Sequence, residues 1–167
     1  PRFLTAHRIF IAGGEIGQLF GKFRLGKAIA QQLSSLGINL NFAPSLDVNN
    51  NPANPVINAR SFGDNAAAVA QAGGAMLSAM QNAGVLGTIK HFPGHGDTHV
   101  DSHTGLPLVE HDKATVEAVD LYPFRQLIKQ HQPAMVMTAH IQYPALDNSS
   151  LTTKSGEAVI KPATLSR

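Results

Sequence analysis

Apolar positions along the chain recur with helical spacing in some segments and as short continuous runs in others. Residues 15–36 place apolar or small side chains three to four positions apart, which predicts a helix that Gly37 ends. Residues 38–43 form a short apolar run that is typical of a buried strand. The turn-rich stretch 45–63 comes next, and loops of this length in compact domains are often functional.

The same alternation continues through the rest of the chain. Asp64 is expected to be the N-cap of a helix over 65–83, in which paired glycines at 73 and 74 predict close packing against a neighbour. The later expected elements are a strand at 85–91, a helix from Asp112 to about His131 that restarts at Pro123, a strand at 134–140, a short helix near 155–160 and a helix that begins at Pro162. This order predicts an α/β protein with parallel strands, as a doubly wound sheet or a (β/α) barrel.

Composition removes several classes of protein from consideration. The chain of 167 residues is one domain in length, with a formal net charge of +2 and no cysteine. The absence of cysteine excludes disulfides, thiolate metal sites and a thiol nucleophile. Basic residues form no run and no stretch of apolar residues is long enough for a membrane span, so neither nucleic acid nor a bilayer is the expected partner. The compartment stays open between the bacterial cytoplasm and the periplasm.

The most informative segment follows the strand predicted at 85–91. It reads KHFPGHGD at 90–97 and DSH at 101–103, and loops at the C-terminal ends of barrel strands build active sites. Its histidines recur every fourth residue, at 91, 95, 99 and 103, which on a helix would suggest a metal site. Proline and glycine at 93, 94 and 96 argue against a helix, so no metal is expected. We expect a local loop hydrogen bond for His95 and a solvated side chain for His99.

This segment closely resembles the signature of the N-acetylhexosaminidase branch of glycoside hydrolase family three. The resemblance extends to FAPSLDV at 42–48, ARSFG at 59–63 and LYPF at 121–124, and so covers nearly the whole chain. It implies that residues 1–167 are a single partial domain, an incomplete (β/α)8 barrel of the TIM type. It also implies a retaining glycosidase with no cofactor, which removes terminal β-linked N-acetylglucosamine from muropeptides or chitin oligosaccharides.

The resemblance further assigns roles to individual residues. Lys90 and His91 would bind hydroxyls of the N-acetyl sugar, and Arg60 would be a further sugar contact or, alternatively, a structural salt bridge. His103 would be the general acid/base with Asp101 as its partner. Imidazole suits this role because its ordinary pKa of about 6.5 makes both protonation states available near neutral pH. The alternative for this pair is an unrelated polar turn, and the two side chains can meet only if the backbone curls. We interpret Asp47, at a strand end after an apolar segment, as either structural or a support for the residues that contact the sugar.

Two family segments do not occur in the sequence. The nucleophilic aspartate is expected beyond Arg167, and an Asp-x-Glu-Gly-Gly segment is expected before Pro1. The chain alone is therefore expected to be inactive or nearly so. Its open strand edges and apolar surface are expected to invite self-association or partial disorder. Three alternatives remain: a β-glucosidase-type enzyme of the same family, a non-catalytic sugar-binding domain and a metal-dependent barrel hydrolase.

Overall fold

The computed structural model describes residues 15–166. Its helical elements are α1 (Glu15–Ser35), the 3-10 helix η2 (Asn58–Arg60), α2 (Ala66–Asn82), α3 (Lys113–Thr115), the π-helix η3 (Val116–Asp120), α4 (Tyr122–His131) and the 3-10 helix η4 (Ala163–Leu165). Its strands are β1 (Leu40–Asn41), β2 (Leu86–Phe92), β3 (Met135–Thr138), β4 (Ser150–Thr152) and β5 (Ala158–Ile160). Helices alternate with strands along residues 15–138, as the sequence predicts.

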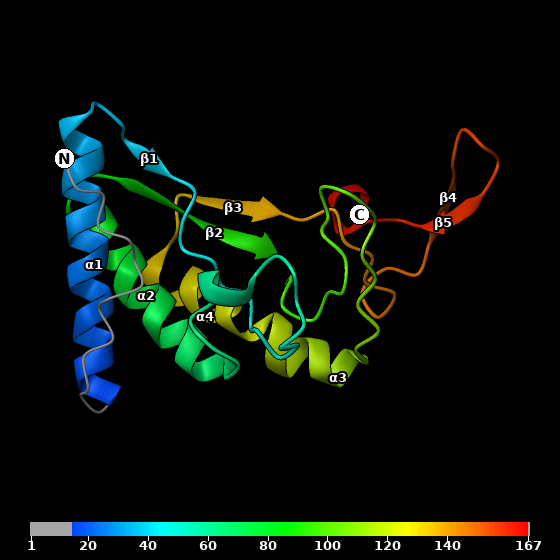
Figure 1. The fold of residues 1–167 in the computed structure, drawn as a ribbon, viewed down its shortest axis with the longest axis horizontal. Coiled ribbons are helices and arrows are strands. Elements are labelled where there is room, and N and C mark those ends of the chain that lie inside the picture. The colour runs from blue at the N-terminus through cyan, green and yellow to red at the C-terminus, as the bar shows by residue number, and fades with distance from the viewer. Residues whose placement is uncertain (1–14, 167) are drawn as a thin grey trace.

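Strands β1, β2 and β3 form one parallel sheet, with β2 in the centre. Leu40 pairs with Leu86 on one side of β2, and Thr88 pairs with Met135 on the other. The three strands point the same way in Figure 1, and α2 and α4 lie side by side along one face of the sheet. Because the strands are parallel, their C-terminal ends meet at one edge of the sheet. The predicted α/β class is confirmed.

Small residues allow the helices to pack closely. A Cβ atom at Gly26 of α1 would lie 2.6 Å from the carbonyl oxygen of Met76 in α2, so this position accepts only glycine without movement of the backbone. In α2, a Cβ atom at Gly73 would meet Leu46, and one at Gly74 would meet the ring of His131. The close packing predicted for the paired glycines is confirmed.

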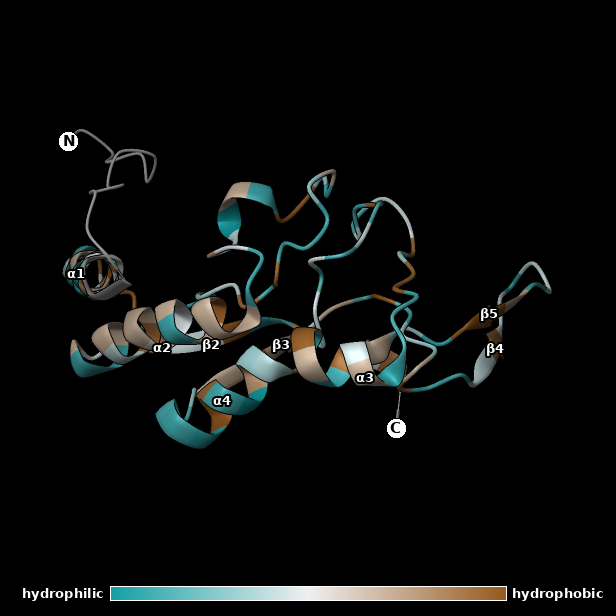
Figure 2. Cartoon of the chain, turned by 90° about the horizontal axis from the view of Figure 1, so that it is seen from below, coloured by the Kyte–Doolittle hydropathy of each residue, from teal (hydrophilic) through white to brown (hydrophobic). Residues whose placement is uncertain are grey.

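Apolar side chains fill the space between the helices and the sheet. The fully buried members with the largest side chains include Phe124, Leu46, Leu77, Ile89 and Leu127. Figure 2 shows mainly apolar residues along α2 and a mixture of hydrophilic and apolar residues in α4. The edge strand β3 is more open, since Met135 and Val136 are 46% and 41% exposed. Within residues 15–166, no helix is long and apolar enough to cross a membrane.

Three details of the predicted elements are wrong or incomplete. The N-cap of α2 is Asn65, whose side chain accepts from the amide of Ala68, rather than Asp64. The helix predicted over 112–131 is divided among α3, η3 and α4. The helix predicted near 155–160 does not form, because β5 pairs there with β4 in an antiparallel hairpin. Its turn contains Gly156 at a φ of 87°, and the β-branched residues that follow favour a strand.

Candidate active site

Lys90 and His91 lie near the C-terminal end of β2, where the segment that follows β1 runs beside them. The amide of Leu46 donates to the carbonyl of Lys90 at 2.6 Å, which continues the parallel pairing past the end of β1. This arrangement places Asp47 directly against His91. The sheet edge therefore holds the side chains for which sugar contacts are predicted on a rigid part of the fold.

Asp47 connects several parts of this edge. Its Oδ2 accepts from the hydroxyl of Ser45 at 2.5 Å and from Nδ1 of His91 at 2.7 Å. Its Oδ1 accepts from the backbone amides of His91 and His95 at 3.1 and 2.8 Å. Burial raises the pKa of this carboxyl, but the hydrogen bonds and charge of His91, with Ser45, hold the pKa below its usual value. Asp47 is therefore an ionised carboxylate, which fixes the proton of His91 on Nδ1 and leaves Nε2 directed elsewhere.

Arg60 belongs to η2, in the long loop after β1. Its Nε donates to the carbonyl of Val56 at 3.0 Å, and the side chain is exposed. Among residues 15–166 it forms no salt bridge, so the alternative role as a structural ion pair has no support there. Burial lowers the pKa of Lys90, the charge of Arg60 lowers it further, and Asp47 opposes both. The two predicted sugar contacts thus lie close enough for their charges to interact.

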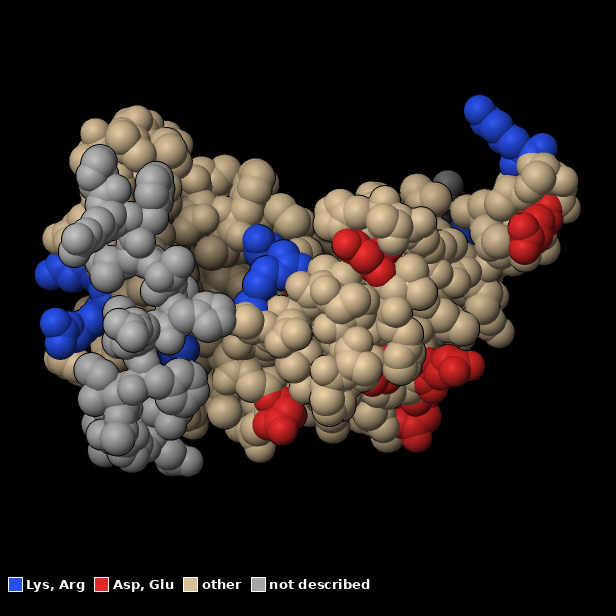
Figure 3. Space-filling model, in the orientation of Figure 1, with Lys and Arg blue, Asp and Glu red and all other residues tan. Residues whose placement is uncertain are grey.

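Charged side chains form separate groups on the face of the molecule that is drawn in Figure 3. Figure 3 shows one group of basic side chains beside a hollow near the middle of the face, with acidic side chains scattered around it. Residues other than lysine, arginine, aspartate and glutamate make up most of the rest of the described surface on that face.

Asp101 and His103 meet on the loop that follows β2. Oδ1 of Asp101 accepts from the amide of His103 at 2.9 Å and lies 2.7 Å from its Nδ1. The backbone turns here, since the amides of Thr104 and Gly105 both donate to the carbonyl of Asp101. The curl that the pair requires is therefore present. The amide of His103, and then its side chain, lower the pKa of Asp101.

The dyad and the lysine–histidine pair are linked indirectly. No hydrogen bond or ion pair in the described part of the chain joins Asp101 or His103 to Lys90 or His91. The connection runs instead through His95, whose ring lies 5.9 Å from that of His91 between centroids and whose Nε2 is 3.0 Å from the hydroxyl of Ser102. The local loop hydrogen bond expected for His95 is confirmed.

Three side chains that shape the loop were not identified from the sequence: Asn54, Tyr143 and His111. Asn54 Nδ2 donates to the carbonyl of His95 at 2.7 Å, and the hydroxyl of Tyr143 donates to the carbonyl of Gly94 at 2.7 Å. Their partners lie more than 40 positions away in the sequence, so no local pattern could reveal them. The asparagine-rich character of the 45–63 loop is the one available signal for Asn54.

His111 joins the loop to the π-helix. Its Nε2 lies 2.9 Å from a carboxylate oxygen of Asp97, and its Nδ1 lies 2.8 Å from one of Asp120. Burial raises the pKa of Asp120, and the hydrogen bond from His111 opposes this effect. The start of the loop is thus fastened from both sides, whereas the segment around His103 extends into solvent.

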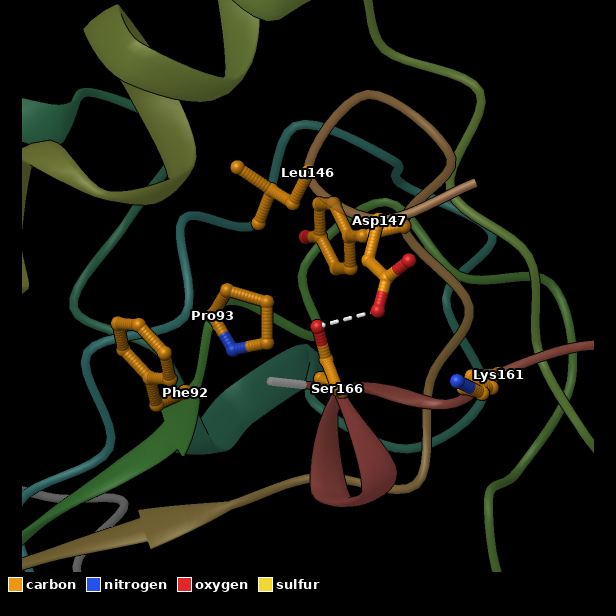
Figure 4. Close-up of a pocket in the computed structure, with 8 residues that line it drawn as sticks. Phe92, Pro93, Leu146, Asp147, Lys161 and Ser166 are labelled. Carbon is orange, nitrogen blue, oxygen red and sulfur yellow. Dashed lines mark hydrogen bonds between the residues drawn. The ribbon is translucent and has the colours of Figure 1, made fainter. Parts of the chain in front are cut away.

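A small hollow lies on the other side of the loop, just past the end of β2. Figure 4 shows Phe92 and Pro93 on one side of it and Asp147 and Ser166 on the other, with the serine hydroxyl donating to the carboxylate at 2.7 Å. Hydrogen bonds from the side chains of Ser149 and then Ser166 lower the pKa of Asp147 to about 2. None of the five residues predicted to bind or transform substrate lines this hollow.

Comparison with known proteins places this arrangement in a family. Residues 23–167 match the model of the glycosyl hydrolase family 3 N-terminal domain. The chain belongs to this family. The predicted relationship and the α/β fold expected of part of its barrel are both confirmed.

The curated relatives of this family member include hexosaminidases. Beta-hexosaminidase A of Pseudoalteromonas piscicida is 58% identical over 86% of this chain, which spans 24% of that protein. Beta-hexosaminidase LpqI of Mycobacterium tuberculosis is 40% identical over 81% of this chain, which spans 34% of that protein. The chain thus spans about a quarter of the length of the first relative and about a third of the length of the second.

Solved structures agree with this relationship. A glycoside hydrolase family 3 β-N-acetylglucosaminidase from Paenibacillus superimposes on 89% of this chain and 26% of its own, with a TM-score of 0.80 and 45% identity. NagZ from Neisseria gonorrhoeae, in complex with N-trifluoroacetyl-D-glucosamine, covers 81% of this chain and 39% of its own, with a TM-score of 0.73 and 38% identity.

Proposed function

We propose that the protein containing this chain is a retaining β-N-acetylhexosaminidase that removes terminal β-linked N-acetylglucosamine. The observation that carries the proposal is the Asp101–His103 contact of 2.7 Å on an exposed loop, attached to the strand end that bears Lys90 and His91. The names of the relatives support the substrate class. The natural substrate is proposed to be a muropeptide or a chitin oligosaccharide.

In such an enzyme, some residues of this chain would bind the sugar and others would transfer the proton. Lys90 and Arg60 would donate hydrogen bonds to sugar oxygens, and Nε2 of His91, whose ring proton is on Nδ1, would accept one from a sugar hydroxyl. His103, with Nδ1 held by the ionised Asp101, would donate the proton on Nε2 to the leaving oxygen as the glycosidic bond breaks. The neutral imidazole would then take a proton from the water that attacks the covalent sugar–enzyme intermediate, which restores the acid. Asp101 would stabilise the charged imidazolium that exists between turnovers.

The nucleophile for the first step is proposed to be an aspartate outside residues 1–167. The chain spans only a fraction of its relatives, so the proposal concerns the whole protein and not this segment alone. We treat residues 1–167 as a single partial barrel domain that contributes the acid/base group and part of the sugar site. The 167-residue segment is accordingly expected to have little or no hydrolytic activity.

Replacement of His103 by alanine in the full-length protein tests the proposal. With a para-nitrophenyl N-acetyl-β-glucosaminide, kcat should fall by about 10²- to 10⁴-fold, because the leaving group no longer receives a proton. With a dinitrophenyl leaving group, which departs without a proton, the rate of the first step should change much less. Added azide should restore part of the turnover by attacking the intermediate without general-base help.

His99 provides a matched control on the same loop. His99→Ala removes an exposed imidazole whose contact is with Asn51, so its activity should match the unchanged protein. Equal loss in the two variants would contradict the assignment of His103. A full-length protein that prefers the matching β-glucoside would instead favour the β-glucosidase alternative. Binding of N-acetylglucosamine without hydrolysis of any glycoside would favour the alternative of a non-catalytic sugar-binding domain.

We also propose that the 167-residue segment self-associates in isolation. Met135 and Val136 on the edge strand β3 are close to half exposed, and exposed apolar edges invite pairing with another chain. Sedimentation velocity at increasing concentrations of this segment should show species larger than the monomer. A single monomeric boundary over the whole concentration range would contradict the proposal.

A further inference from the structure

His95 is held rigidly in the interior, although no reaction step has been assigned to it. Its side chain is 1% exposed. Its amide donates to Asp47 at 2.8 Å, and its carbonyl accepts from Asn54 at 2.7 Å. Its Nδ1 lies 2.6 Å from the hydroxyl oxygen of Thr98, which is itself fully buried. The backbone and one ring nitrogen of His95 are therefore fixed before its second nitrogen is considered.

The contacts of Thr98 determine the protonation of the ring. The hydroxyl proton of Thr98 goes to the carbonyl of His95 at 3.0 Å, so its oxygen accepts from the ring. Burial lowers the pKa of His95, which keeps the ring neutral and its single proton on Nδ1. The remaining nitrogen, Nε2, is an acceptor, and the hydroxyl of Ser102 donates to it at 3.0 Å.

We propose that His95 is a positioning residue for the acid/base dyad, and that the Ser102–His95 hydrogen bond holds Asp101 and His103 at a defined place over the sugar site. Ser102 stands between the two members of the dyad in the sequence. Its side chain attaches the turn that carries Asp101 and His103 to the buried ring of His95. This inference rests on the proposed function, and it adds an assignment for two residues to which that function gives no role.

The same attachment couples the dyad to the sugar-binding strand end. Oδ1 of Asp47 accepts from the amides of both His91 and His95. The position of the His91 ring and the position of the His95 ring therefore depend on one buried carboxylate. A short series of contacts, from His91 through Asp47 and His95 to Ser102, fixes the distance between the group that holds the sugar and the group that moves the proton.

The test uses Ser102→Ala in the full-length protein, because this change deletes the donor and leaves the buried histidine in place. With a para-nitrophenyl N-acetyl-β-glucosaminide, kcat should fall about 10- to 100-fold through misplacement of the dyad. KM and the dissociation constant of N-acetylglucosamine should stay the same, since the sugar contacts are not altered. Ser102→Thr keeps a hydroxyl and should recover most of the rate. Ser155→Ala, which deletes a hydroxyl contact in the β4–β5 hairpin, is the matched control and should leave kcat unchanged.

Ring nitrogen chemical shifts of His95 give a readout that does not require activity. In the unchanged protein they should report a neutral ring protonated at Nδ1, and Ser102→Ala should shift Nε2 while Ser155→Ala should not. Unchanged kcat in Ser102→Ala, or a rise in KM alone, would overturn the positioning role. If the unchanged protein hydrolyses no glycoside, the proposed function fails, and the shifts then decide separately whether Ser102 is bound to His95.

Discussion

The Asp47–His91 pair and the Asp101–His103 pair each join a carboxylate oxygen to histidine Nδ1 at 2.7 Å, and they differ in their surroundings. In the first pair the histidine and aspartate side chains are 15% and 0% exposed. In the second pair the corresponding values are 80% and 38%. The same chemical contact is thus placed once in the interior and once in solvent.

The number of additional donors separates the two carboxylates further. Asp47 also accepts from Ser45 and from two backbone amides, whereas Asp101 also accepts from one amide, that of His103. A buried carboxylate with several donors remains ionised and immobile. An exposed pair can change its protonation state at little cost in stability. The difference fits the proposed roles, in which His91 of the first pair contacts the sugar and His103 of the second pair transfers a proton.

The largest expected effect is on stability. Asp47→Ala in the full-length protein should lower the free energy of unfolding of this domain by about 3–5 kcal/mol, because it leaves buried donors and the His91 ring without their partner. Asp101→Ala should leave the denaturation midpoint unchanged. Urea unfolding followed by circular dichroism measures both. Equal destabilisation by the two variants would show that burial does not distinguish the pairs.

Much of this comparison could be predicted from the sequence, but the partner of His91 could not. The KHFPGHGD and DSH segments identified both the strand end and the exposed dyad, since Asp101 and His103 are close in sequence and their turn is local. Asp47 lies 44 positions before His91, and only the parallel pairing beyond β1 brings them together. Its burial is consistent with a structural residue. The hydrogen bond from Ser45 is local, but the other three, from His91 and His95, depend on tertiary structure.

The short helix predicted near 155–160, where the structure has the β4–β5 hairpin, is wrong for a different reason. Residues 155–160 are a short segment with both helix-forming and β-branched residues, and periodicity does not separate helix from strand at that length. The Ser-Gly pair at 155 and 156 was the available signal for a turn. By contrast, α1 and α2 are long and each ends two residues before a glycine, and the sequence predicts both nearly to their boundaries.

A smaller effect is expected on the decrease in the free energy of unfolding at acid pH. The pKa of Asp47 is lowered in the folded protein, so its contribution to stability is complete above the ordinary carboxyl pKa of about 3.9 and is lost as the pH falls through the folded value. Asp47→Asn should therefore flatten the decrease in the free energy of unfolding below about pH 4. This effect should be smaller than that of Asp47→Ala, because a neutral amide oxygen still accepts from the backbone amides.

Asp120→Asn provides a control, because it is expected to change the pH dependence of the free energy of unfolding in the opposite direction. Burial raises the pKa of this carboxyl in the folded protein, so its contribution becomes more favourable as the pH falls from the folded value toward about 3.9. Asp120→Asn should consequently steepen the loss of stability on acidification, whereas Asp47→Asn flattens it. Urea midpoints measured at several pH values between neutrality and acid would show the two slopes. If both variants change the slope in the same direction, the opposite environments inferred for these two buried carboxylates are wrong.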